Sequence, residues 1–137
     1  MVPYYLPDGQ LLNINSPRFM GPEAIFIPSL IQEGDTTPGL HELVHQSIQD
    51  CDIDIRKELY MSIILSGGNS LFPGLPERLQ KELFKKVNKK LLVMVDDPDD
   101  RYYSIWYGGA ILASLATFDN QWITRDLYQA NGSRIVH

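Results

Sequence analysis

The segment that most constrains this fold is an apolar run at residues 61–65 that leads directly into the glycine pair Gly67 and Gly68. Such a run predicts a strand buried on both faces of a largely parallel sheet. A second run of the same kind follows at residues 91–95. Between them, apolar residues recur at helical spacing: Leu75, Leu79, Leu83 and Val87. The sequence therefore predicts one βαβ unit, with its glycine loop at the carboxyl end of the first strand.

The first part of the chain predicts a hairpin, a short helix and a loop. Residues 4–6 and 11–14 flank the turn signal Pro7-Asp8-Gly9-Gln10, which favours a hairpin. Asn15 or Ser16 can cap a helix that begins at Pro17, and Gly21-Pro22 predicts a break or kink before residues 23–26 resume the helical pattern. Residues 28–39 are rich in Pro, Gly, Asp and Thr, and they predict a surface loop with an exposed apolar tip.

The remaining segments read mainly as helices. Apolar spacing predicts two consecutive helices over residues 40–48 and 53–60, and residues 96–100 form an acidic loop. Residues 103–115 are apolar enough for a buried helix, in which Gly108 and Gly109 would permit close backbone approach. Thr124 can cap a last short helix that Asn131-Gly132 ends, before a short extended stretch at residues 135–137.

Composition bounds the class of protein. The 137 residues suit one domain or a fragment, and the net charge of −5 argues against nucleic acid or anionic lipid as a partner. Five lysines between residues 81 and 90 fit a solvated helix face. The single cysteine, Cys51, excludes an intrachain disulfide and is expected to be a small buried hydrophobe. No apolar run approaches the roughly 20 residues of a membrane span and no signal peptide is evident, so we expect a soluble, intracellular protein without membrane insertion.

The glycine loop is the main candidate for chemistry. Paired glycines leave room for a base or sugar phosphate against the peptide planes, but they also suit a tight strand-to-helix turn, and spacing alone favours neither. No P-loop or Rossmann fingerprint occurs. His41 and His45 share a helix face without a further metal motif. The aromatic run is expected to be helix core and rim: Tyr102, Tyr103, Trp106 and Tyr107. We assign no catalytic residue and no metal.

These segments together resemble actin and the actin-related proteins, from residue 5 to residue 137. Six stretches carry the resemblance, in the family's order: residues 5–10, 18–19 with 22–24, 51–57, 65–68, 111–115 and 135–137. The resemblance implies an α/β fold, an incomplete actin-like (ribonuclease-H-like ATPase) fold that corresponds to the C-terminal portion. Two predicted strands and a hairpin are few for a doubly wound sheet. Expected parts are a hairpin and helix over 1–27, a plug-like loop over 28–39, a βαβ-containing part over 40–101 and C-terminal helices over 102–137.

The resemblance also implies one wall of a nucleotide site. Its adenosine-side loop corresponds to Gly67, Gly68, Asn69, Leu71 and Phe72. ATP or ADP is the implied ligand, but the family's phosphate loops and catalytic residues have no counterpart in these residues, and Tyr102 stands where actins usually carry a nucleotide-contacting lysine. The alternative function is an ATP-binding ATPase whose missing N-terminal lobe is supplied by a longer gene product or another chain.

The resemblance also implies surfaces that bind partners, and it implies that the protein is a subunit of a cytoskeletal filament or assembly. The residues concerned are Asp52, Asp54, Ile55 and Arg56 for a contact along a filament strand, Leu30 and Ile31 for the plug-like loop, and Leu112, Leu115 and Thr117 for a hydrophobic target-binding cleft. The loop is two residues longer than in actins, and Gln121 replaces a methionine of that cleft. Implied partners are actin or actin-like subunits, actin-binding proteins or a larger assembly, in the cytoplasm and cytoskeleton or the nucleus. A further hypothesis is a fragment that needs partners to fold.

Overall fold

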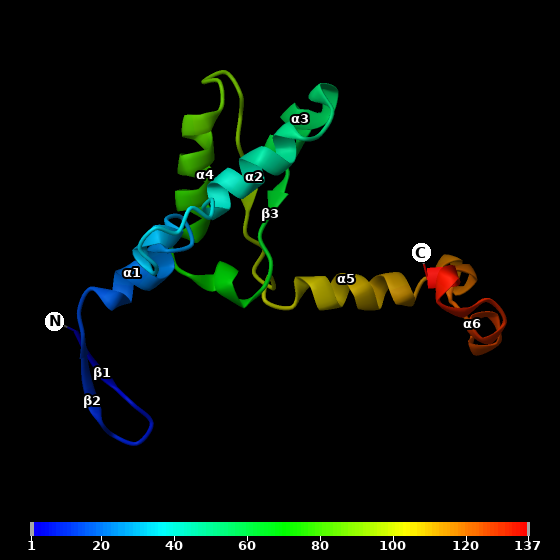
Figure 1. The fold of residues 1–137 in the computed structure, drawn as a ribbon, viewed down its shortest axis with the longest axis horizontal. Helices are drawn as coiled ribbons and strands as arrows, with labels where there is room; N and C mark the ends of the chain where they lie inside the picture. The colour runs from blue at the N-terminus through cyan, green and yellow to red at the C-terminus, as the bar shows by residue number, and fades with distance from the viewer. Residues whose placement is uncertain (1, 137) are drawn as a thin grey trace.

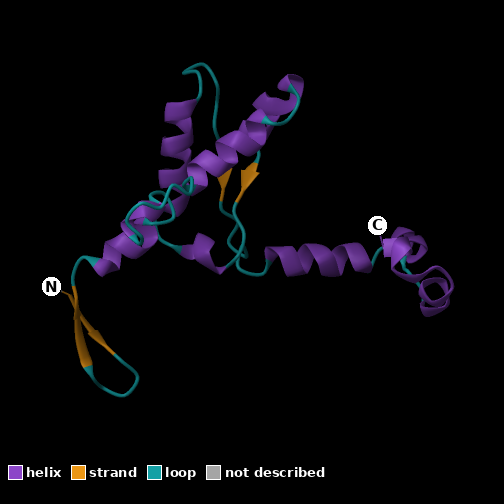
Figure 2. Cartoon of the chain, in the orientation of Figure 1, coloured by secondary structure: helices purple, strands orange, loops and turns teal. Residues whose placement is uncertain are grey.

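The computed structural model describes residues 2–136 (Figure 1). A central body holds helices around a parallel pair of strands, while a hairpin projects from one end and the last helices project from the other (Figures 1 and 2). The fold is therefore mixed α/β, as predicted, although most of its regular structure is helical.

The predicted hairpin is confirmed. Strands β1 (Val2–Tyr5) and β2 (Leu11–Ile14) pair antiparallel, with Tyr4 opposite Leu12. The Gly9 amide donates to the Leu6 carbonyl at 2.9 Å, and Gly9 adopts a φ of 83°. That left-handed conformation is open to glycine at little cost, which explains the residue at this turn.

Helix α1 (Pro17–Glu23) starts at a proline and contains Pro22 in its last turn. The predicted break at Gly21-Pro22 is wrong, because α1 runs through both residues to Glu23. Residues 24–26 then form tight turns in place of the predicted helical continuation, and the Phe26 amide donates to the Glu23 carbonyl at 2.9 Å. Pro22 lacks the N–H that would bond the Arg18 carbonyl in the preceding turn, but its φ suits a helix, so this short helix can pass through it. The loop that follows includes the short 3₁₀ helix η1 (Pro28–Leu30), and its tip is exposed, as predicted.

Helices α2 (Leu40–Gln49) and α3 (Ile53–Tyr60) are the predicted consecutive pair. Asp52 separates them and caps α3, because its carboxylate accepts a hydrogen bond from the Asp54 amide at 3.3 Å. Cys51 is only half-buried, and its thiol donates to the Ser47 carbonyl at 3.3 Å. The expectation of a buried hydrophobe at Cys51 is therefore wrong, because the residue lies at the exposed junction of two helices.

The predicted βαβ crossover is present, but its strands are shorter than predicted, and residues 91–94 of the second apolar run lie outside the strand. Strand β3 (Ile63–Ile64) pairs in parallel with β4 (Val95–Asp96), and helix α4 (Leu75–Lys86) connects them. The prediction that both strands are buried on both faces is wrong, however. Ile64 is 63% exposed although Leu65 is buried, and Leu92 is exposed although Val93 is buried. Helices α2 and α4 contribute to a core on one face of the strands, so that only alternate side chains are covered within residues 2–136.

The core lies between these helices and strands. Its most deeply buried side chains are Tyr60, Leu79, Leu83 and Val93. The Tyr60 hydroxyl lies 2.7 Å from His45 Nδ1 and accepts a hydrogen bond from Gln49 Nε2 at 3.2 Å. Buried polar groups need such partners, and this network satisfies the Tyr60 hydroxyl.

Helix α5 (Ser104–Ala113) leads away from the central body (Figure 1). The predicted buried helix is wrong in its burial, since no residue of α5 is buried and Ile105 is 76% exposed. A Cβ atom added at Gly108 or Gly109 would meet no described atom of another element within 4 Å, so these glycines make no close backbone approach. No described helix is long and apolar enough to cross a membrane.

The last elements are helical. The 3₁₀ helix η3 (Ala116–Gln121) is followed by α6 (Arg125–Asn131), where the Thr124 hydroxyl accepts from the Leu127 amide at 3.2 Å. Gly132, with a φ of 65°, ends α6, so the predicted cap and stop are confirmed. The expected extended stretch is wrong at residues 135 and 136, which lie in the 3₁₀ helix η4 (Gly132–Val136), and His137 lies outside the described residues.

Candidate functional site

The glycine loop joins β3 to α4 through the 3₁₀ helix η2 (Gly68–Leu71). Gly67, just before η2, has a φ of 89° and a ψ of 167°. This backbone region is essentially restricted to glycine. The Gly67 amide also donates to the Arg101 carbonyl at 2.8 Å. The loop is therefore held by its conformation and by the chain segment that follows β4.

Further hydrogen bonds fix the loop to this second segment. Ser66 Oγ lies 2.8 Å from Ser104 Oγ, and Arg101 Nε donates to the Ser70 carbonyl at 3.3 Å. The Ser70 hydroxyl, which is buried, donates back to the Gly67 carbonyl at 2.6 Å. Side chains and backbone of both segments thus define one preorganised turn, which supports a binding role better than a mobile loop would.

Tyr102 lies against Gly68. A Cβ atom at Gly68 would stand 3.2 Å from Tyr102 Cε2, closer than side chains normally approach. The Tyr102 ring packs edge-to-face with Tyr103 at a centroid distance of 4.4 Å and stays half exposed. The free space above Gly68 is therefore occupied in part by a tyrosine ring of the same chain.

The other members of the predicted loop face outward. Gly68, Asn69, Leu71 and Phe72 are exposed, and Gly67 is half-buried. They follow one another along a single turn, so the structure does bring them together. Within residues 2–136, no group of three or more His, Cys, Asp or Glu side chains is arranged to hold a metal ion.

The aromatic run beside this loop is not helix core, contrary to the prediction. Tyr102, Tyr103, Trp106 and Tyr107 are all exposed, and the last three line a shallow cavity of about 340 Å³. Their rings pack edge-to-face along α5, with Trp106 and Tyr107 centroids 5.3 Å apart. The prediction failed because apolar composition does not say whether another element covers the helix.

The predicted partner residues lie in three separate places. Asp52, Asp54 and Ile55 are exposed at the start of α3. Arg56 is held by its own chain, since its Nε donates to the Cys51 carbonyl at 3.0 Å and its Nη1 to Gln49 Oε1 at 3.1 Å.

The other two places are the loop after α1 and the end of α5. Ile31 is 79% exposed, and Leu30 beside it is exposed as well. The remaining predicted residues, Leu112, Leu115 and Thr117, are exposed on α5 and the segment after it.

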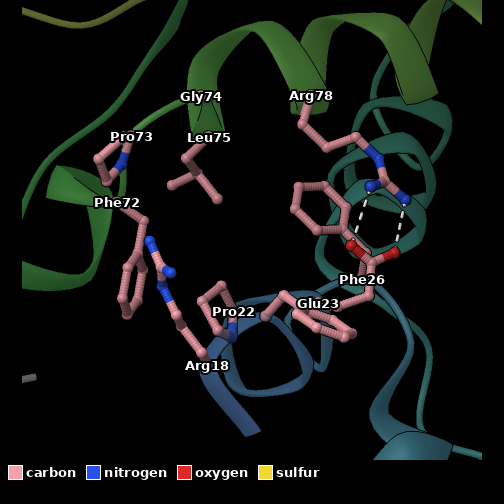
Figure 3. Close-up of a pocket in the computed structure, with 10 residues that line it drawn as sticks. Arg18, Pro22, Glu23, Phe26, Phe72, Pro73, Gly74, Leu75 and Arg78 are labelled. Atoms are coloured by element: carbon pink, nitrogen blue, oxygen red, sulfur yellow. Dashed lines mark hydrogen bonds and ion pairs between the residues drawn. The ribbon is translucent and has the colours of Figure 1, made fainter. Parts of the chain in front are cut away.

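A pocket that the sequence did not predict lies next to Phe72 (Figure 3). It measures about 340 Å³ and is formed where α1 and the turn after it meet the start of α4. The first wall includes Arg18 and Phe26, and the second includes Phe72 and Arg78. Because these walls come from segments far apart in the sequence, no local motif predicts the pocket.

One ion-pair cluster closes an end of this pocket. Arg78 donates from Nη1 and Nη2 to the two carboxylate oxygens of Glu23 at 2.9 and 2.7 Å, and from Nε to Glu82 Oε1 at 3.0 Å. The hydrogen bond to Glu23 raises the pKa of Arg78 above its ordinary value, although burial opposes the change. Glu82 also accepts from Lys85 at 2.8 Å, and this bond is the main cause that lowers the pKa of the Glu82 carboxyl.

The parallel strand pair and its crossover helix place the chain in the α/β class. The glycine turn lies beyond the carboxyl end of β3, which is where ligands bind in open α/β sheets. A family model described as actin matches residues 1–137. The chain therefore belongs to the actin family, as its sequence motifs indicated.

Proposed function

We propose that this chain is a cytoskeletal filament or assembly subunit that acts through protein–protein contacts and contributes one wall of an adenine-nucleotide site. Membership of the actin family supports the general class. The observation that carries the proposal further is the exposed apolar surface of α5, on which Ile105, Ile111 and Leu112 are 76%, 65% and 49% exposed. Apolar surface of this extent marks an interaction site in a soluble protein.

Two other exposed surfaces support the proposal that the chain contacts more than one partner. Ile31 at the tip of the loop after α1 is the most exposed large apolar side chain of the described residues. The start of α3 presents two carboxylates, Asp52 and Asp54, beside the exposed Ile55. An apolar tip at one place and a charged helix end at another suit a subunit with more than one neighbour. Actin, actin-like subunits and actin-binding proteins are the partners proposed.

The nucleotide part of the proposal rests on the glycine turn. Its backbone is preorganised by the Gly67–Arg101 hydrogen bond, and its outer residues are open to a ligand. An adenine or ribose could lie along Gly68 and Phe72, with Tyr102 beside it. The residues that hold phosphates and magnesium in an ATPase would have to come from elsewhere, so the proposed role is binding and not catalysis.

Assembly is tested by sedimentation velocity of the chain alone and mixed with purified actin. We expect a faster-sedimenting species, which the double variant Leu112→Asp/Leu115→Asp weakens because a charge is costly in an apolar interface. The matched control is Val136→Asp, which places the same charge at an exposed apolar position outside α5. A chain that stays monomeric and ignores actin, with the double variant behaving identically, contradicts the assembly role.

Nucleotide binding is tested by titrating ATP and ADP against the chain and following amide signals by NMR. Signals of Gly67, Gly68 and Phe72 are expected to shift, and Phe72→Ala should weaken binding while leaving the fold intact, since Phe72 is exposed. Hydrolysis of ATP by the isolated chain would contradict the binding-only role and favour the ATPase alternative.

A further inference from the structure

The pocket beside Phe72 has an unbalanced charge. Arg78 is neutralised by two carboxylates, and Lys85 adds a second cation to the same cluster, so that these four side chains sum to zero. Arg18 also lines the pocket, and its side chain makes no hydrogen bond or ion pair with any residue in the described range 2–136. The pocket therefore carries one uncompensated positive charge.

The positions of the two arginines differ in a way that matters for a ligand. Figure 3 shows Arg18 with Phe72 on one side of the pocket and the Arg78–Glu23 pair on the other. Arg78 lies over the Phe26 ring at 4.9 Å from its centroid, and its five N–H groups are largely occupied. Arg78 is thus a fixed part of the pocket wall, whereas the guanidinium N–H groups of Arg18 can donate hydrogen bonds to a ligand.

The rest of the lining is largely apolar and aromatic. Phe26 is buried, and Phe72 and Phe19 expose 39% and 67% of their surface. Aromatic faces favour flat apolar guests, which gain both apolar burial and ring contacts. A volume of about 340 Å³ falls within the range of small-molecule sites, at its lower end.

We infer that this pocket binds a small flat aromatic molecule that carries one negative charge, of the aromatic carboxylate class. The ring lies among the phenylalanines, and the carboxylate accepts hydrogen bonds from the Arg18 guanidinium. Charge-assisted bonds of this kind distinguish an acid from a neutral analogue of the same shape. The pocket shares Phe72 with the proposed nucleotide site, whereas Leu75 and Arg78 line this pocket and do not belong to that site, so their signals distinguish the two.

The probes for the test are 2-naphthoate and 2-naphthamide, which share a ring system and differ in charge. Each is titrated into the ¹⁵N-labelled 137-residue chain, and the amide signals of Phe72, Leu75 and Arg78 are followed. We expect naphthoate to shift these signals with an affinity about tenfold above that of naphthamide, because the carboxylate pairs with the Arg18 charge and the neutral amide group does not. Added salt should reduce this ratio, since the site is open to solvent.

The variant Arg18→Gln should reduce naphthoate affinity about tenfold and naphthamide affinity much less, so that the ratio between the two probes falls. Arg18 is exposed, so the fold is expected to persist. The matched control, Arg125→Gln on α6, removes an exposed arginine outside the pocket and should change neither affinity. Equal affinity of the two probes for the parent chain overturns the inference, as does an unchanged ratio in Arg18→Gln. Shifts confined to α5 signals overturn it as well.

Discussion

The conformation of Gly67 gives the sharpest test of how the glycine turn is built. Its φ of 89° and ψ of 167° lie in a region that only glycine occupies freely. A Cβ at this position would have no atom within 4 Å, so the variant Gly67→Ala creates no steric contact with a neighbouring residue. Any loss of stability must therefore come from the backbone itself.

The expected loss follows from the cost of that conformation. A non-glycine residue held in such a region costs about 1–3 kcal/mol, so we take roughly 2 kcal/mol for alanine. For a chain of this size, 1 kcal/mol corresponds to a change in melting temperature of roughly 4 °C. Gly67→Ala is therefore expected to melt about 8 °C below the parent chain, provided that the turn keeps its conformation.

Thermal unfolding followed by circular dichroism measures this effect, and Gly108→Ala provides the matched control. Gly108 lies inside α5, its φ is not positive, and its added Cβ would also meet nothing within 4 Å. Replacing a helical glycine by alanine stabilises a helix by about 0.5–1 kcal/mol. The same chemical change should thus have opposite signs at the two positions. A Gly67→Ala chain as stable as the parent would refute the reasoning.

Three further predictions use the same melting assay. Leu83→Ala should cost about 2–5 kcal/mol, because Leu83 is fully buried, whereas Phe84→Ala should cost far less at its exposed neighbour. Tyr60→Phe should cost about 1–3 kcal/mol, since the imidazole and amide groups that bond its hydroxyl lose their partner. Lys85 lowers the pKa of Glu82 below its ordinary 4.5, so the stability from ionised Glu82 is present above that value and lost as pH falls through the lowered pKa. Glu82→Gln should flatten this acid dependence, and an unchanged pH profile contradicts the assignment.

Much of the local structure could be predicted because turns, caps and helix ends depend on residues that are close together in the sequence. The turn at Gly9, the cap at Thr124 and the stop at Gly132 each depend on residues within a few positions. The βαβ crossover was predicted from two apolar runs and a helical stripe, and Leu79 and Leu83 of that stripe are indeed buried. The glycine loop also lies at the predicted strand end, although its assignment to a nucleotide remains a prediction.

The errors concern which surfaces are covered, a property that sequence periodicity does not contain. Ile64 and Leu92 read as buried because they belong to continuous apolar runs, yet both are exposed. Helix α5 was predicted to be core for the same reason, yet none of its residues is buried. The pocket around Arg18 and Arg78 escaped prediction because its walls meet only in three dimensions, across an ion pair 55 residues apart in sequence.

The wrong burial predictions also bear on function, because each of them predicted burial for apolar side chains that are exposed. In each case, side chains suited to an interior lie exposed within the described residues, and exposed apolar surface is costly for a soluble protein. The affected places are the outer face of β3, the segment before β4 and the whole of α5. Such faces gain stability when another protein surface covers them, so the apolar pattern itself favours a subunit whose complete interior forms only in contact with further polypeptide. On this reasoning, addition of a genuine partner should raise the melting temperature of the chain, whereas a bystander protein at equal concentration should leave it unchanged.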